Sequence, residues 1–117
     1  SQYSKAKVES ARAVTLLKVM RRTAMIDVRE AVRQVDTDLE RIKAAKATLR
    51  FAEEKLNAEK KKYEVGLSTT HDLLEFQDDL ARAESREAMA RADCEKSLAN
   101  LSRVKGILLE EYDINVD

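Results

Sequence analysis

The feature that most constrains this chain is a long stretch without helix breakers. From Ser4 to Glu64 the sequence contains neither glycine nor proline, and it is rich in Ala, Glu, Lys, Arg and Leu. These residues favour the helical backbone, whereas one proline in a helix interior costs about 3 kcal/mol. We therefore expect one long helix over about residues 4–64 and a second over about residues 70–112, joined by a turn at 65–69.

The composition limits the thickness of the core. Charged residues make up 38% of the 117 residues and aromatic residues 4%, so the apolar side chains can fill a narrow seam between helices but not a globular interior. The 22 basic and 22 acidic residues balance, which argues against a nucleic-acid partner. We expect a single elongated all-α domain over residues 1–117.

One apolar position recurs every seven residues in the first stretch. A period of 3.5 residues keeps a seam facing a partner helix along a left-handed supercoil. We expect a companion position four residues further on, at Val32 and Leu39, which then turns polar. The seam positions are Val28, Val35, Ile42, Leu49, Leu56 and Tyr63.

The same spacing returns in the second half of the chain, which is the expected partner of the first seam. The fold class predicted is therefore a long antiparallel coiled-coil helical hairpin. The only cysteine, Cys94, is interpreted as a small apolar seam residue. The second seam comprises Leu73, Leu80, Cys94, Leu101 and Leu108, broken once at Glu87, with Phe76, Ala83, Ala90 and Val104 beside it.

Each half also carries a stripe of small residues. A helix with a large-residue seam on one side and a small-residue seam on another can pack against two neighbours, as in a wall of helices. Because alanine is also the best helix former, exposed alanines need no partner, and this alternative stays open. The stripes are Ala24, Ala31, Ala45 and Ala52 in the first half, and Ala81, Ser85, Ala88, Ala92, Ala99, Ser102 and Gly106 in the second.

The two expected helices differ in length. At 1.5 Å per residue, about 60 residues run roughly 90 Å and about 42 residues roughly 63 Å. The chain up to about Arg22 should therefore extend beyond its partner, and its apolar residues should lack cover from this chain. These residues are Val8, Ala11, Val14, Leu17, Met20 and Met25.

Local signals in the interruption predict a tight turn. Gly66 suits the left-handed residue that closes a helix, and the basic run before it complements the negative end of the helix dipole. Thr69 suits the N-cap of the next helix, with Asp72 as the third residue of its first turn.

The sequence offers no chemistry of a catalytic or metal site. His71 is the only histidine and lies far from Cys94, and the adjacent Asp78 and Asp79 point about a hundred degrees apart on a helix. No window approaches the length of apolar residues that spans a bilayer, and the first residues show no signal pattern. We expect no enzyme, cofactor, metal or membrane-spanning segment in this chain, which is compatible with a piece of a larger secreted protein.

The residues around the turn resemble a known family. The stretch 63–83 is similar to the signature Tyr-Glu-x-Gly-x-x-Thr-x-x-Asp-Leu-Leu-x-x-Gln-x-x-Leu-x-x-Ala of the TolC-like outer-membrane efflux family. Residues 27–31 resemble the Glu-Val-Arg-x-Ala that opens the long helix of that family. Residues 90–93, with Leu98 and Leu101, resemble its returning helix, and residues 106–112 its short tail.

The resemblance implies a homo-trimer whose helical hairpins form a periplasmic α-barrel, continued by a β-barrel in the outer membrane. Its partners would be a periplasmic adaptor (membrane fusion protein) and an inner-membrane transporter. This chain would then be a periplasmic part of an outer-membrane protein. The expected adaptor contacts are the tip residues Gly66, Leu67, Ser68 and Thr69, and the expected acidic pore ring is Asp72 and Glu75.

Simpler interpretations stand beside these assignments. The tip residues are also explained by the turn alone, Asp72 by helix capping and Glu75 by ordinary surface charge. Ser68 stands where some family members carry arginine, so a salt-bridge gate of that kind is not supported, and Cys94 stands where an aromatic residue is usual.

Two other classes remain open from the residues. One is a stand-alone coiled-coil structural or interaction protein. The other is the hairpin of a periplasmic adaptor, whose tip pattern residues 60–76 do not provide.

Overall fold

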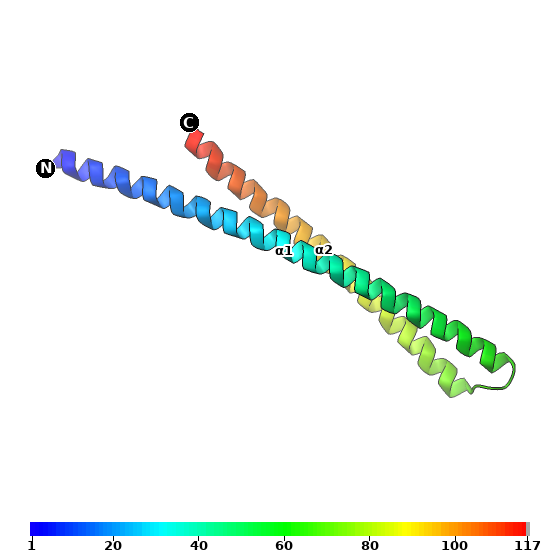
Figure 1. Ribbon diagram of the computed structural model, residues 1–117. Coiled ribbons are helices and arrows are strands. Elements are labelled where there is room, and N and C mark those ends of the chain that lie inside the picture. The colour runs from blue at the N-terminus through cyan, green and yellow to red at the C-terminus, as the bar shows by residue number, and fades with distance from the viewer. Residues whose placement is uncertain (117) are drawn as a thin grey trace. The chain divides into compact units, whose positions relative to one another are not determined.

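Two helices make up the fold (Figure 1). The computed structural model describes the backbone of residues 1–116 and the side chains of residues 1–113. Helix α1 spans Gln2–Glu64 and helix α2 spans Thr70–Val116. The helical hairpin predicted from the sequence is thus confirmed. Helix α2 continues beyond the predicted end at about residue 112, and Asp117, the last residue of the expected domain, lies outside the described residues.

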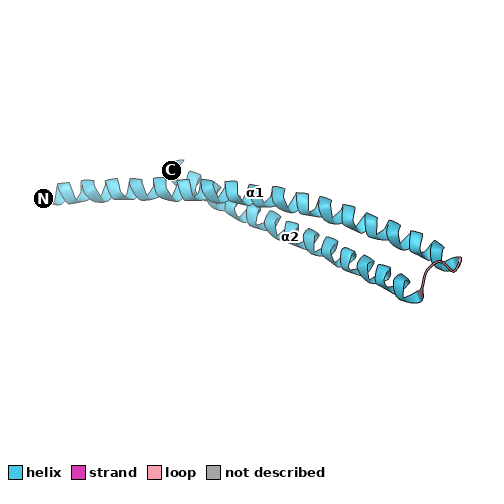
Figure 2. Cartoon of the chain, turned by 60° about the horizontal axis from the view of Figure 1, so that its bottom comes forward, coloured by secondary structure: helices cyan, strands magenta, loops and turns pink. Residues whose placement is uncertain are grey.

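The chain divides into two compact units, each built from one part of both helices. Unit 1 comprises residues 1–35 together with the chain from Ser97 onward, and unit 2 comprises Asp36–Lys96 with the turn. Within each unit the two helices run antiparallel and side by side (Figure 2). The expected single domain therefore stays a proposal.

The seam of unit 2 alternates large and small side chains. Leu56 is buried on α1 between half-buried Leu49 and the turn, while Phe76 and Leu80 are half-buried on α2. Most of its buried apolar members are small, which permits a close approach of the two helix backbones. The buried apolar residues of this unit are Ala52, Leu56, Ala83, Ala90 and Cys94.

Unit 1 repeats this arrangement. Val28 is half-buried on α1, and Leu101 and Leu108 are half-buried on α2. The heptad predicted for α2 is therefore the seam of both units. The buried apolar residues of this unit are Ala24, Ala31, Val35 and Val104.

The companion position predicted on α1 is wrong. Val32 and Leu39, four residues after the seam valines, are 44% and 51% exposed, and Tyr63 at the end of the seam is 43% exposed. The companion is instead the position three residues after the seam position, where Ala31 follows Val28, Ala45 follows Ile42 and Ala52 follows Leu49. A coiled-coil seam uses alternating steps of three and four, and only the small alanine permits the close contact seen here.

The prediction that the alanine stripe of α1 forms an interface with a second neighbour is also wrong. Its alanines lie in the hairpin seam, where Ala24, Ala31 and Ala52 are buried and Ala45 is half-buried, so they face α2 and no further neighbour. The small residues of α2 behave differently. Every one of them, from Ala81 to Gly106, is exposed. Helix α2 therefore keeps a second small-residue stripe that α1 does not cover.

One charged residue, Asp38, is buried in the seam of unit 2 at 2% exposure. Its Oδ1 lies 3.9 Å from Nη1 of Arg41, which in turn lies 3.5 Å from Oδ2 of Asp93 on α2. A buried carboxylate is tolerated when it is paired, and losing its partner is strongly destabilising. Asp38 lies seven residues after Ala31 and seven before Ala45, so it shares their face of α1. The sequence alone did not predict its burial.

The start of α1 is uncovered, as expected. Residues 1–16 are all exposed, whereas Leu17 is half-buried and so has more cover than predicted. In the described part of the chain, neither helix combines the length and apolarity that crossing a membrane requires.

A matched pair of substitutions tests the seam. Ala90 is 3% exposed and Ala88, two residues earlier on the same helix, faces solvent. Ala90→Leu should destabilise the chain by about 1–3 kcal/mol because the close helix contact has no room for a larger side chain. Ala88→Leu should change the stability by less than about 0.5 kcal/mol. Urea unfolding followed by circular dichroism measures both, and equal effects would contradict this assignment of the seam.

Candidate functional site

Gly66 ends helix α1 in a left-handed conformation. Its φ is +78°, and among the described residues no residue other than a glycine has a positive φ. The Leu67 amide donates to the Lys62 carbonyl at 2.8 Å, and the Gly66 amide donates to the Tyr63 carbonyl at 3.1 Å. These two bonds form a Schellman motif, which satisfies carbonyls that the helix end leaves free. The predicted role of Gly66 in the turn is confirmed.

Thr69 begins helix α2 as its N-cap. Its Oγ1 accepts a hydrogen bond of 3.1 Å from the Asp72 amide, and its carbonyl accepts one of 3.0 Å from the Leu73 amide. The threonine hydroxyl thereby replaces the helical partner that the Asp72 amide lacks. Asp72 takes part through its backbone, and its carboxylate adds a negative charge at the positive end of the helix dipole.

Side chains brace the turn from both helices. Ser68 Oγ donates a hydrogen bond to Oε1 of Glu59, whose side chain is only 12% exposed, and Glu59 Oε2 lies 4.0 Å from Lys62 Nζ. Tyr63 Oη and Thr70 Oγ1 share a hydrogen bond of 3.3 Å. The sequence analysis missed Glu59 and placed Tyr63 in the seam. Each of these two hydrogen bonds joins a residue of α1 to a residue that follows Gly66. The periodicity of a single helix does not predict such a pair.

The turn displays backbone and two apolar side chains. Val65 and Leu67 are 70% and 78% exposed, while Ser68 between them and α2 is half-buried. Because Gly66 and Thr69 fix the backbone on both sides, these two side chains project from a defined scaffold. Large apolar side chains held in the open are a common feature of protein interaction sites.

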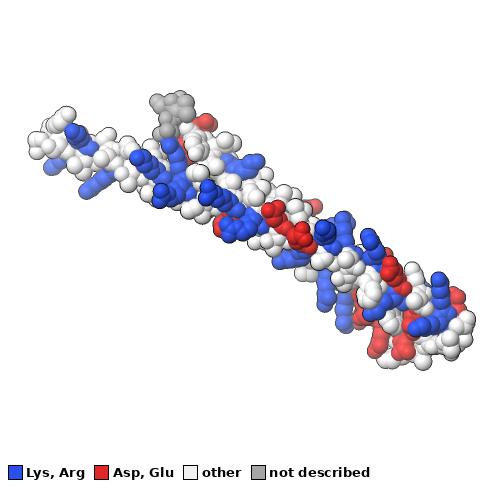
Figure 3. Space-filling view, in the orientation of Figure 1, with Lys and Arg blue, Asp and Glu red and all other residues white. Residues whose placement is uncertain are grey.

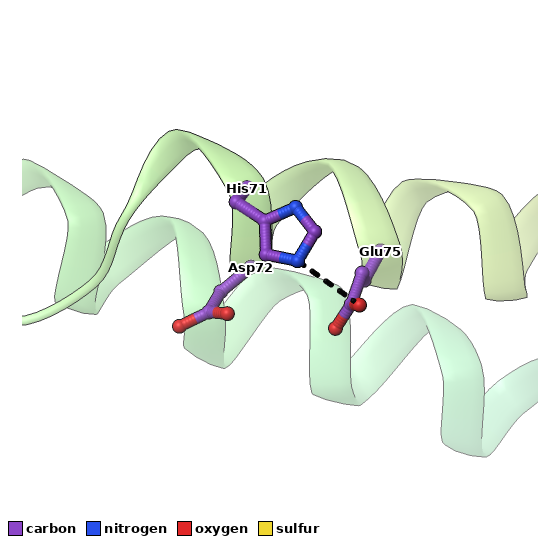
Figure 4. A group of neighbouring side chains, drawn as sticks. All are labelled: His71, Asp72 and Glu75. Carbon is purple, nitrogen blue, oxygen red and sulfur yellow. Dashed lines mark ion pairs between the residues drawn. The ribbon is translucent and has the colours of Figure 1, made fainter.

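The two expected ring carboxylates lie in the first turns of α2 (Figure 4). Asp72 is half-buried, and Glu75 is exposed with its Oε1 3.3 Å from Nε2 of His71. The spacing of four residues between His71 and Glu75 brings them to one face of the helix, a signal that the sequence analysis did not use.

His71, Asp72 and Glu75 each offer one ligand-type atom, and these atoms lie within 4.8 Å of one another (Figure 4). A histidine and two carboxylates are ligands that divalent metals accept. The imidazole and the Glu75 carboxylate are mostly exposed, however, and the helix N-terminus disfavours a cation. We therefore assign no metal to this group.

The two glycines of the chain give a matched test of the turn. Gly66→Ala should destabilise the chain by about 1–2 kcal/mol because a Cβ is strained at positive φ. Gly106 lies within α2 with open space around its Cα, so Gly106→Ala should stabilise the chain by up to about 1 kcal/mol. Urea unfolding of both variants should show these opposite signs, and two shifts of the same sign would contradict the assigned role of Gly66.

Comparison with known proteins matches most of the hairpin to a protein family. The sequence model of a single family, described as outer membrane efflux protein, matches residues 1–106. No curated protein and no solved structure is significantly similar to the chain. The match covers all of α1, the turn and most of α2, and it concerns a family of transport channels and not of enzymes. The chain therefore belongs to the outer membrane efflux protein family.

Proposed function

We propose that this hairpin is a periplasmic wall segment of a trimeric outer-membrane duct. In this role it helps to carry small molecules or proteins out of a Gram-negative cell, together with a periplasmic adaptor and an inner-membrane transporter. The observation that carries the proposal is the exposed small-residue stripe of α2. Family membership supports the channel class, and the stripe supports the position of the hairpin in a wall.

The stripe has the spacing of a second helix interface. Its members follow alternating steps of three and four residues on a face of α2 that α1 leaves open. Glu95 is the one large residue in the series. Small side chains let a neighbouring backbone approach closely, so a hairpin with this face can join two others side by side. A free-standing hairpin has no need of the second face.

The tip is proposed as the contact with the adaptor. Leu67 and Val65 present apolar side chains at the end of the hairpin, and the Gly66 backbone lies open between them. An adaptor hairpin that covers this end would bury these side chains, which contributes about 25 cal/mol per Å² of apolar area. Ser68 and Thr69 would then act chiefly by holding the turn in shape.

Asp72 and Glu75 are proposed to line the narrow end of the duct. In a trimer, three copies of each carboxylate would surround one axis close to the tip. Like charges at short range resist simultaneous ionisation and attract cations, so such a ring would favour the passage of cations over anions. Three exposed His71 side chains, each beside a Glu75, would share this end of the duct.

Cysteine cross-linking tests the wall. In a Cys94→Ala background, we expect Ala88→Cys in the native protein to give a covalent dimer with a short bismaleimide, which joins two thiols, because Ala88 lies on the exposed stripe. Ala90→Cys is the matched control, since its side chain is buried against α1 and should stay monomeric. Bands are read on a denaturing gel. A monomer with both variants would contradict a wall of packed hairpins.

Substitutions at the tip test the adaptor contact. Leu67→Asp should reduce adaptor cross-linking and efflux by about tenfold, because it places a charge in an apolar contact without altering the turn bonds. Gly66→Asp should also weaken docking, through both strain and charge. Leu74→Asp, on an exposed position of α2 beyond the tip, is the control. Unchanged efflux and unchanged cross-linking with Leu67→Asp would rule out the tip as the docking surface.

A further inference from the structure

Unit 1 holds a pocket of about 410 Å³ that the proposed function does not use. It lies between α1 and the end of α2 and is lined by four basic side chains, two aliphatic side chains and one aromatic ring. Its size falls in the range of small-molecule sites. The basic residues are Lys18, Arg21, Arg22 and Arg29, and the apolar ones are Met25, Ile26 and Tyr112.

Arg21 is the least exposed residue of the pocket and has unsatisfied donors. Its Nε and Nη2 are buried without a hydrogen-bond partner in the described part of the chain. The guanidinium carbon lies 5.5 Å from the centroid of the Tyr112 ring, whose hydroxyl donates a weak hydrogen bond of 3.9 Å to Met25 Sδ. A buried guanidinium with unpaired N–H groups is destabilising, and an anion that accepts from them removes this cost.

The other three cations of the pocket are also available. Within the described residues, Lys18, Arg22 and Arg29 form no ion pair. Glu111 in the same unit has a buried Oε2 without a partner, and no ion pair joins it to Arg21. Within the described residues, no ion pair therefore engages any of the four cations of the pocket.

The charge of the whole chain is divided unevenly between the units. Unit 1 contains ten Lys and Arg residues against seven Asp and Glu, whereas unit 2 contains twelve against fifteen. Figure 3 shows basic side chains gathered along the N-terminal half of α1 on the face that is drawn. The pocket thus lies in the unit that carries the basic excess, and four basic side chains line it, a setting that attracts anions.

The apolar side chains define the rest of the ligand. Met25, Ile26 and Tyr112 are 38%, 49% and 44% exposed, so the pocket offers apolar surface next to its cations. An inorganic anion would leave this surface in water, whereas an anion with an attached ring covers it. We propose that this pocket binds a small organic anion, a carboxylate or a phosphate ester, that carries an aromatic or aliphatic ring.

In this arrangement Arg21 and the rim cations hold the anionic group, and Tyr112, Met25 and Ile26 hold the ring. Arginine suits the task because its planar fork matches two oxygens of a carboxylate or phosphate. The inference stands independently of the duct proposal, since no residue of the pocket belongs to the small-residue stripe of α2 or to the tip.

Calorimetric titration of the 117-residue chain with 2-naphthoate and with 2-naphthyl phosphate tests the proposal, and the tighter of the two identifies the anionic group. We expect saturable binding of one molecule per chain. Acetate and inorganic phosphate, which lack the ring, and 2-naphthylmethanol, which lacks the charge, should each bind at least about tenfold more weakly.

Variants assign the binding to the pocket. Arg21→Gln should weaken binding at least about tenfold, and Arg21→Lys by less, because lysine keeps the charge but not the fork. Arg12→Gln, at an exposed arginine earlier on α1, is the matched control and should leave affinity unchanged. Circular dichroism of each variant verifies that it is folded. Absence of saturation, equal binding of acetate, or an equal loss with Arg12→Gln would each overturn the proposal.

Discussion

The close contact of two helix backbones along an alanine-lined seam is the constraint on which the rest of the structure depends. Ala24, Ala31 and Ala52 of α1 and Ala83 and Ala90 of α2 are among the most buried residues. Large side chains between them fill the remaining space, so a core that is one seam wide suffices for a chain with 38% charged residues. The heptad alanines of α1 are used here, whereas the small-residue stripe of α2 is left for another neighbour.

The turn serves this seam and supplies the proposed contact surface. Gly66 and Thr69 satisfy the ends of both helices with backbone and hydroxyl hydrogen bonds, and Glu59 and Tyr63 brace the turn from α1. The chain reverses without burying an apolar residue at the tip, so Val65 and Leu67 stay exposed. The tip and the stripe of α2 are two separate uncovered surfaces, as a wall segment with a docking end requires.

Periodicity and capping rules predicted the helices, the turn and the α2 seam, because these depend on residues near one another in sequence. They did not predict the companion seam of α1. Valine and leucine are more hydrophobic than alanine, but alanine lets two helices pack more closely. The line that begins with Val32 and Leu39 turns polar at Lys46, whereas the line of Ala24 and Ala31 continues to Ala52. The buried Asp38, the bond from Ser68 to Glu59 and the pocket at Arg21 each need residues brought together by the hairpin, so no local pattern indicates them.

The most direct test of the central claim is the size and location of the native protein. An antibody raised against the 13.3 kDa chain is used on separated cell fractions resolved by a denaturing gel. If the chain is a duct-wall segment, we expect a polypeptide much larger than 13.3 kDa in the outer-membrane fraction. A soluble species near 13.3 kDa would contradict it and leave a self-contained coiled-coil hairpin.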